Sequence, residues 1–137
     1  MSSKYLYGLL GGGCLHRKIM VVDDRFGIRK LLCEVLQDDG YQVLTAAGGK
    51  EALELLKEHP VDLILLDMKM SGMDGLETLT LLKKVRPQTI VLIMTAYEEL
   101  EALKEACRRG AAGYISKPFD IEEIKGLIAA KLQAEIA

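Results

Sequence analysis

The fold of this chain is decided by the stretch Val61-Asp62-Leu63-Ile64-Leu65-Leu66-Asp67, an almost wholly apolar run that ends in a carboxylate. The loop that follows it reads Met68-Lys69-Met70-Ser71-Gly72-Met73-Asp74-Gly75. A continuous apolar run is typical of a strand that is covered on both faces, as in parallel sheets. Open α/β sheets bind ligands beyond the carboxyl ends of their strands. The stretch therefore predicts a buried strand that presents Asp67 at a ligand-binding edge.

Other apolar runs in the chain also end in polar side chains. The run 19–22 is followed by Asp23 and Asp24, the run 90–94 by Thr95, and the run 113–116 by Lys117. Three acids at one edge raise each other's pKa unless a cation neutralises them, and Mg²⁺ prefers oxygen ligands of this kind. An amine and a hydroxyl suit the oxygens of a phosphoryl group. The alternative, in which Asp23-Asp24 only caps the next helix, leaves Asp67 unexplained.

Segments with strand and helix patterns alternate strictly from Lys18 onward. Strands are expected at about 18–23, 41–46, 61–66, 90–94 and 113–116. Helices are expected at about 25–38, from Gly48-Gly49 to His59, from Asp74 or Gly75 to before Pro87, and at about 98–109 and 120–134. Five such units predict an α/β domain with a parallel sheet, helices on both faces and right-handed crossovers.

The length, charge and cysteine content of the whole chain limit the classes of protein to which it can belong. Its 137 residues suit one domain, and its formal net charge of −2 lacks the basic stripe of a nucleic-acid-binding protein. No apolar run reaches the ~20 residues of a membrane span. The cysteines are Cys14, Cys33 and Cys107, and their odd number and wide spacing favour free thiols in a reducing cytosol. We therefore expect a cytoplasmic protein without a membrane span.

The first seventeen residues form an extension that is distinct from the domain at 18–137. The segment 5–15 is apolar but interrupted by glycines. A strand is expected directly after it, at about Lys18, which leaves no polar spacer of the kind that follows a signal peptide. A cloning remnant, a misassigned start and a docking arm remain open for this extension, and each is favoured over secretion.

The residues at the strand ends also carry a family resemblance. The motifs are Val21-Val22-Asp23-Asp24, Leu65-Leu66-Asp67-Met68, Gly72-Met73-Asp74-Gly75, Met94-Thr95-Ala96 and Lys117-Pro118-Phe119. Over about 18–135 the chain resembles the receiver domain of bacterial two-component response regulators. Within that family it is most similar to the stand-alone receiver of the sporulation phosphorelay. The resemblance implies a doubly wound, flavodoxin-like fold with five parallel strands in the order 2-1-3-4-5.

The resemblance also implies a role for each acid of the site. Asp67 is expected to accept the phosphoryl group. Asp24 and Asp67 are expected to bind Mg²⁺ directly, with Asp23 nearby or acting through water. The backbone carbonyl of Lys69 is the expected third protein ligand. The domain would thereby catalyse its own Mg²⁺-dependent phosphorylation and dephosphorylation, as a relay protein rather than as a metabolic enzyme.

Three further residues take roles in catalysis and switching by the same resemblance. Lys117 and the hydroxyl of Thr95 are expected to contact phosphoryl oxygens. Thr95 and Tyr114 resemble the switch pair, in which the hydroxyl moves toward the phosphoryl group and the aromatic ring turns inward.

A partner surface is expected beside the site. Its expected residues are Gly27, Ile28, Leu31, Tyr97, Pro118 and Phe119. The partners implied by the resemblance are a sensor histidine kinase and a histidine phosphotransferase or other response-regulator partner. Direct binding to nucleic acid is not expected. The expected assembly is a monomer or a weak, phosphorylation-dependent dimer.

The chain departs from the family at Ser71, where the family usually has proline. Because proline fixes φ, its replacement by serine predicts a freer loop at 70–72.

The preferred function is that of a relay receiver that takes a phosphoryl group from phospho-histidine and passes it on. The alternative is the N-terminal regulatory receiver of a DNA-binding transcription factor. A flavin protein or a phosphatase on the same architecture is disfavoured, because Asp23-Asp24 is the wrong charge for a phosphate loop and Lys69 stands where such phosphatases carry a second acid.

Overall fold

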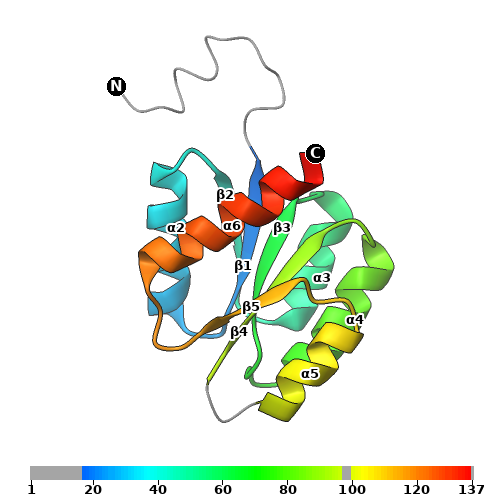
Figure 1. The fold of residues 1–137 in the computed structure, drawn as a ribbon. Helices are drawn as coiled ribbons and strands as arrows, with labels where there is room; N and C mark the ends of the chain where they lie inside the picture. The colour runs from blue at the N-terminus through cyan, green and yellow to red at the C-terminus, as the bar shows by residue number, and fades with distance from the viewer. Residues whose placement is uncertain (1–16, 97–99, 137) are drawn as a thin grey trace.

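The computed structural model describes residues 17–96 and 100–136. Its elements, in chain order, are β1 (Lys18–Val22), α2 (Phe26–Asp38), β2 (Gln42–Ala46), α3 (Gly49–Glu58), β3 (Leu63–Asp67), α4 (Gly75–Val85), β4 (Ile90–Thr95), α5 (Leu100–Arg108), β5 (Gly113–Ser116) and α6 (Ile121–Ile136). The strands pair in parallel in the order β2-β1-β3-β4-β5 (Figure 1). The expected doubly wound α/β fold and its strand order are confirmed.

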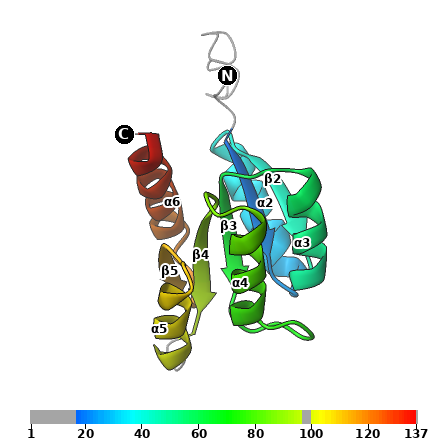
Figure 2. The same cartoon turned by 90° about the vertical axis from the view of Figure 1, so that its right-hand side faces the viewer.

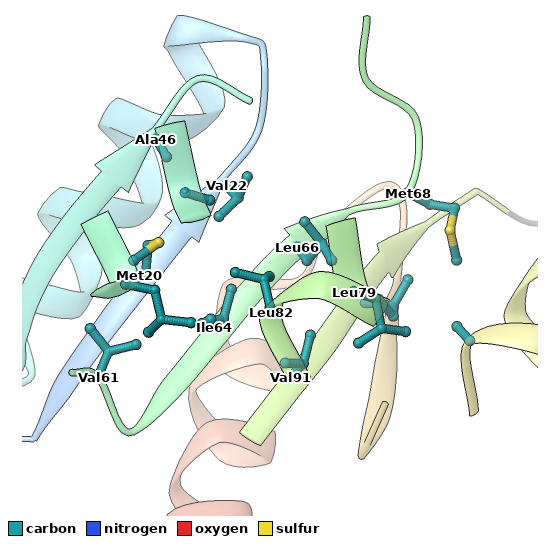
Figure 3. Close-up of a cluster of buried hydrophobic side chains, with 14 residues drawn as sticks. Met20, Val22, Ala46, Val61, Ile64, Leu66, Met68, Leu79, Leu82 and Val91 are labelled. Carbon is teal, nitrogen blue, oxygen red and sulfur yellow. The ribbon is translucent and has the colours of Figure 1, made fainter. Parts of the chain in front are cut away.

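The sheet has an apolar layer on each face, and successive side chains of a strand belong to opposite layers. In β1, Met20 and Val22 belong to the buried cluster beneath α3, α4 and α5, which Figure 3 shows in close-up. Ile19 and Val21 belong to the opposite cluster, beneath α2 and α6. The alternation follows from the pleat of a strand, which sends successive side chains to opposite faces. Figures 1 and 2 show the sheet between these helices.

The boundaries of β3 differ from the expected ones by two residues at the start and one at the end. The strand begins at Leu63 rather than Val61, although the Asp62 amide already donates to the Lys18 carbonyl at 2.8 Å and the Asp62 carbonyl accepts from the Ile90 amide at 3.1 Å. The Asp62 carboxylate accepts from the Lys18 amide at 2.8 Å and pairs with Arg17 at 3.6 Å. At the other end the strand includes Asp67, and β4 likewise includes Thr95. Both polar residues are thus held by the sheet itself.

Two helix ends show common capping features. Asp120 Oδ1 accepts from the Glu122 amide at 2.9 Å at the start of α6. Gly110, just after the end of α5, has φ of 108°, a value that residues other than glycine rarely adopt. The expected start of α5 at residue 98 falls outside the described residues, as does nearly all of the extension at 1–17. Among the described residues, no helix has the length and apolar character needed to cross a membrane.

Candidate functional site

Three carboxylates meet at the carboxyl edge of the sheet. Asp23 and Asp24 follow β1, and Asp67 ends β3; because Val22 pairs with Leu66, the parallel register sets these strand ends side by side. One oxygen from each acid lies within 4.8 Å of the others. The side chains of Asp23 and Asp67 are buried, whereas Asp24 is exposed. The sequence placed these acids at one edge, and the structure brings them together.

Asp67 is a buried carboxylate with a cationic partner. Its Oδ1 accepts from Lys117 Nζ at 2.7 Å and from the Lys69 amide at 3.4 Å. Burial raises the pKa of Asp67 above its usual value, and the neighbouring charge of Asp23 raises it further, while the hydrogen bond from Lys117 opposes both effects. A further cation beside Asp67 would therefore favour its ionised form.

Lys117 is carried to Asp67 from the far end of the chain by the sheet. Its amide donates to the Thr95 carbonyl at 2.8 Å, which anchors the residue after β5 to the end of β4. The peptide bond between Lys117 and Pro118 is cis. The Lys117 side chain is only 20% exposed, so the ammonium group is directed inward rather than into solvent.

Asp23 is bound by an arginine that the sequence reasoning missed. Arg25 Nε donates to Asp23 Oδ1 at 3.1 Å and Arg25 Nη2 donates to Oδ2 at 3.0 Å, while the Arg25 amide also donates to Oδ1 at 2.8 Å. Arg29 Nη1 donates to the Asp23 carbonyl at 2.8 Å. The hydrogen bond to Asp23 raises the pKa of Arg25 further above its already high value. The position of this arginine directly after the acid pair is the sequence signal from which the contact could have been found.

Asp24 is held by Ser71, and this contact changes the expectation of a freer loop. The Ser71 amide and hydroxyl both donate to Asp24 Oδ2, each at 3.1 Å. The amide hydrogen bond is the main reason that the pKa of Asp24 lies below its usual value. Where proline would order the loop through its ring, serine ties it to an acid of the cluster by two hydrogen bonds.

The loop after Asp67 is packed closely against the start of α4. The Gly75 amide donates to the Met68 carbonyl at 3.2 Å, and a Cβ at Gly75 would lie 2.7 Å from Met68 Cα. Asp74 caps α4 by accepting from the Glu77 amide at 2.8 Å. Glycine is therefore required at this close approach of two backbone segments, which holds the chain just beyond Asp67 in place.

The expected switch residues lie on neighbouring strands in different environments. Thr95 is 4% exposed, and its hydroxyl donates to the Ala96 carbonyl at 3.2 Å. Tyr114 is 50% exposed, and its backbone lies opposite Ile93 in the sheet. The hydroxyl is thus buried at the carboxyl edge, and the aromatic ring is in contact with solvent. Their switch role stays a prediction.

The expected partner surface separates into buried and exposed residues. Ile28 and Phe119 are partly buried against the core beneath α2 and α6. Leu31 is 42% exposed. The sequence reasoning missed Phe26, which is 68% exposed on the same helix and lies beneath the Arg29 guanidinium, 5.7 Å from its ring centre. Pro118 and Gly27 are exposed, and Tyr97 lies outside the described residues.

The donor set of the acid cluster fits a hard divalent cation. It offers only oxygen atoms, and their spread of at most 4.8 Å is close to the ~4 Å that separates opposite ligands of Mg²⁺ bound at 2.0–2.1 Å. Softer transition metals favour nitrogen or sulfur ligands, and the cluster contains neither.

Comparison with known proteins gives concordant matches. The family model described as the response regulator receiver domain matches residues 19–129. Sporulation initiation phosphotransferase F of Bacillus subtilis is 46% identical over 114 residues, which cover 83% of this chain and 92% of that protein. The transcriptional regulatory protein ZraR of Escherichia coli is 40% identical over 110 residues, which cover 80% of this chain but only 25% of that protein.

The solved structures agree with these matches. The response regulator receiver domain protein from Methanospirillum hungatei, described as CheY-like, superposes with a TM-score of 0.84 at 31% identity. The match covers 87% of this chain and 95% of that one.

Proposed function

This chain belongs to the response regulator receiver domain family, and from that premise we propose that Asp67 is its phosphoryl acceptor. One observation carries the proposal: the buried Asp67 carboxylate lies within the acid cluster and also accepts a hydrogen bond from Lys117 at 2.7 Å. A carboxylate placed between a cation site and a lysine has the charge neutralisation that phosphoryl transfer needs. The family implies interaction with a histidine kinase or phosphotransferase as the donor.

The proposed reaction moves a phosphoryl group from a histidine nitrogen to Asp67. An oxygen of the ionised carboxylate forms a bond to phosphorus while the bond between phosphorus and the imidazole nitrogen breaks, and the electron pair stays on that nitrogen. The Lys117 ammonium remains in place to hold a phosphoryl oxygen. The Thr95 hydroxyl, now donating to the Ala96 carbonyl, turns to donate to a second phosphoryl oxygen.

Mg²⁺ is the proposed cofactor of this site. Asp24 and Asp67 would bind it directly, Asp23 would bind it through water, and the Lys69 carbonyl would complete the protein ligands. When bound, the ion supplies positive charge beside the transferred group. The oxygen-only donor set and its compact spacing support this assignment.

For the pathway, we propose a relay that passes the phosphoryl group to a histidine phosphotransferase. The relative that supports this choice is a phosphotransferase that the chain matches over 92% of its length. The second candidate is the regulatory domain of a transcription factor, which is supported by a relative that the chain matches over only 25% of its length. The length of the full reading frame discriminates between these two functions.

Intact-mass spectrometry tests the acceptor. Incubation of the full chain with acetyl phosphate and Mg²⁺ is expected to add one phosphoryl group, which EDTA prevents and Asp67→Asn abolishes. Asp62→Asn is the matched control, because it changes an acid that directly precedes the same strand, at the end opposite to Asp67. Modification that persists in Asp67→Asn would refute the assignment.

A further inference from the structure

The acid cluster contains its own cation. We infer that Arg25 sets the affinity of the cluster for a divalent cation, because its guanidinium is a built-in counter-ion on Asp23 with which an incoming metal ion must compete. The inference rests on the proposed metal site and adds to it a residue that weakens metal binding.

The contact between Arg25 and Asp23 involves both oxygens of the carboxylate. The side chain of Arg25 engages both carboxylate oxygens of Asp23, at 3.1 and 3.0 Å, and the Arg25 amide adds a third hydrogen bond at 2.8 Å. A carboxylate has about four lone-pair sites, so these three donors leave about one. Asp23 therefore has about one lone-pair site, on Oδ2, for a metal ion or its bound water while the guanidinium is in place, and it gains further sites only if the guanidinium withdraws.

The burial of the two partners is unequal, which makes the withdrawal feasible. The Asp23 side chain is fully buried, whereas the Arg25 side chain is 50% exposed. A buried charge needs a partner, and removal of its partner leaves an uncompensated charge. The exposed guanidinium can move into water, but only when another cation takes its place beside Asp23.

The charges of the site also indicate that Arg25 weakens metal binding. Arg25 and Lys117 supply two positive charges to a cluster with three carboxylates, and each cation contacts a different acid. The metal-free site is thus largely neutralised before any ion arrives. Replacement of Arg25 by a neutral residue should strengthen the attraction of the cluster for Mg²⁺.

An orienting role for Arg25 makes the opposite prediction. If the guanidinium served to hold Asp23 in a geometry that the metal ion requires, its loss would weaken metal binding. The sign of the change in Mg²⁺ affinity therefore separates the two roles.

The test is a titration of the full chain with MgCl₂. Binding is measured by isothermal titration calorimetry and, independently, by the rise in melting temperature. Arg25→Gln is expected to bind Mg²⁺ roughly fivefold more tightly than the wild type. This factor corresponds to the interaction energy of one pair of unit charges about 4 Å apart in water. Lys30→Gln removes the same charge from an exposed position on α2 and is expected to change the affinity less than about twofold. Arg25→Lys keeps the charge without the fork and is expected to fall between wild type and Arg25→Gln.

Each outcome decides the inference. Equal or weaker Mg²⁺ binding by Arg25→Gln would overturn it while leaving the proposed metal site intact, and so would an equal effect of Lys30→Gln. If Arg25→Gln does not fold, Arg25→Lys decides, and affinity at or below that of the wild type would overturn the inference. Absence of Mg²⁺ binding in the wild type would overturn the metal site together with the inference.

Discussion

The Lys117 ammonium lies 2.7 Å from Asp67 Oδ1, although the two residues stand 50 positions apart in the sequence. The sheet makes this contact, since β3 and β5 both pair with β4 and end at the same edge. The pair sets a cation beside a buried acid. In the proposed reaction, the same cation would stabilise the negative charge of Asp67 before transfer and of the phosphoryl group after it.

Substitution of Lys117 tests that coupling. Lys117→Gln removes the positive charge and is expected to slow phosphorylation by acetyl phosphate about 100-fold, the usual cost of losing one group that stabilises charge in a transition state. The rate is followed by intact mass. Lys84→Gln, at an exposed position on α4, serves as the control and should leave the rate unchanged. A rate for Lys117→Gln within twofold of wild type would contradict this role.

The raised pKa of Asp67 predicts a pH-dependent cost in stability for the metal-free protein. Between 3.8, its ordinary value, and the higher pKa in the folded state, the folded protein binds more protons than the unfolded chain. The free energy of unfolding therefore falls as pH rises through that window, and above it the ionised Asp67 destabilises the fold.

Asp67→Asn removes this cost. Without Mg²⁺ at pH 7 it is expected to be more stable than wild type by roughly 1 kcal/mol, a typical size for a single substitution. The advantage should vanish below pH 3.8 and shrink when Mg²⁺ stabilises the wild type. Urea unfolding at several pH values measures it, with Asp62→Asn as the control. A variant that is less stable than wild type at pH 7 would show that this charge does not destabilise the fold.

The two hydrogen bonds from Ser71 predict a graded effect on Asp24. Ser71→Ala loses the hydroxyl but keeps the amide, whereas Ser71→Pro loses both donors. Because the amide contributes most, the pKa of Asp24 should return toward 3.8 further in Ser71→Pro than in Ser71→Ala.

Carboxyl-carbon NMR titration of Asp24 measures this effect. Since the folded pKa is depressed, the associated stability is present above 3.8 and is lost as pH falls through the folded pKa. That contribution is small, because the carboxylate is exposed to solvent. A larger pKa change in Ser71→Ala than in Ser71→Pro would mean that the hydroxyl, and not the amide, holds Asp24.

The two apolar residues of α2 that were expected at the partner surface should respond differently to alanine. Ile28 packs against the core, so Ile28→Ala is expected to cost about 1–2 kcal/mol of stability. Leu31 is 42% exposed, so Leu31→Ala should cost less than about 0.5 kcal/mol and yet slow transfer from a phospho-histidine donor. Phosphorylation by acetyl phosphate is the control, since it needs no docked protein. Unchanged transfer in Leu31→Ala would remove this residue from the surface.

The sequence was informative where a side chain's place follows from the backbone alone. Apolar runs that end in polar residues predict Asp23, Asp67, Thr95 and Lys117 at one edge, because parallel strands align their carboxyl ends. The sequence was less informative about which side chains form hydrogen bonds with each other. The fork from Arg25 to Asp23 and the contact from Ser71 to Asp24 depend on rotamers and loop paths, which periodicity does not encode.

Strand boundaries also show what the sequence pattern can and cannot predict. The pattern placed the start of β3 at Val61 because that residue is apolar, whereas the strand begins at Leu63, after the backbone hydrogen bonds of Asp62 to Lys18 and Ile90. Hydrophobicity located the strand but did not fix its first residue, because an apolar residue can directly precede a strand as well as begin it.

The most direct measurement is a crystal structure of the full chain with Mg²⁺ and beryllofluoride, a mimic of the phosphoryl group. The account predicts beryllofluoride attached to a carboxylate oxygen of Asp67, with Lys117 Nζ and Thr95 Oγ1 as donors to its fluorines and Mg²⁺ beside Asp24. A structure in which Asp67 carries no adduct and turns away from the ion would contradict it.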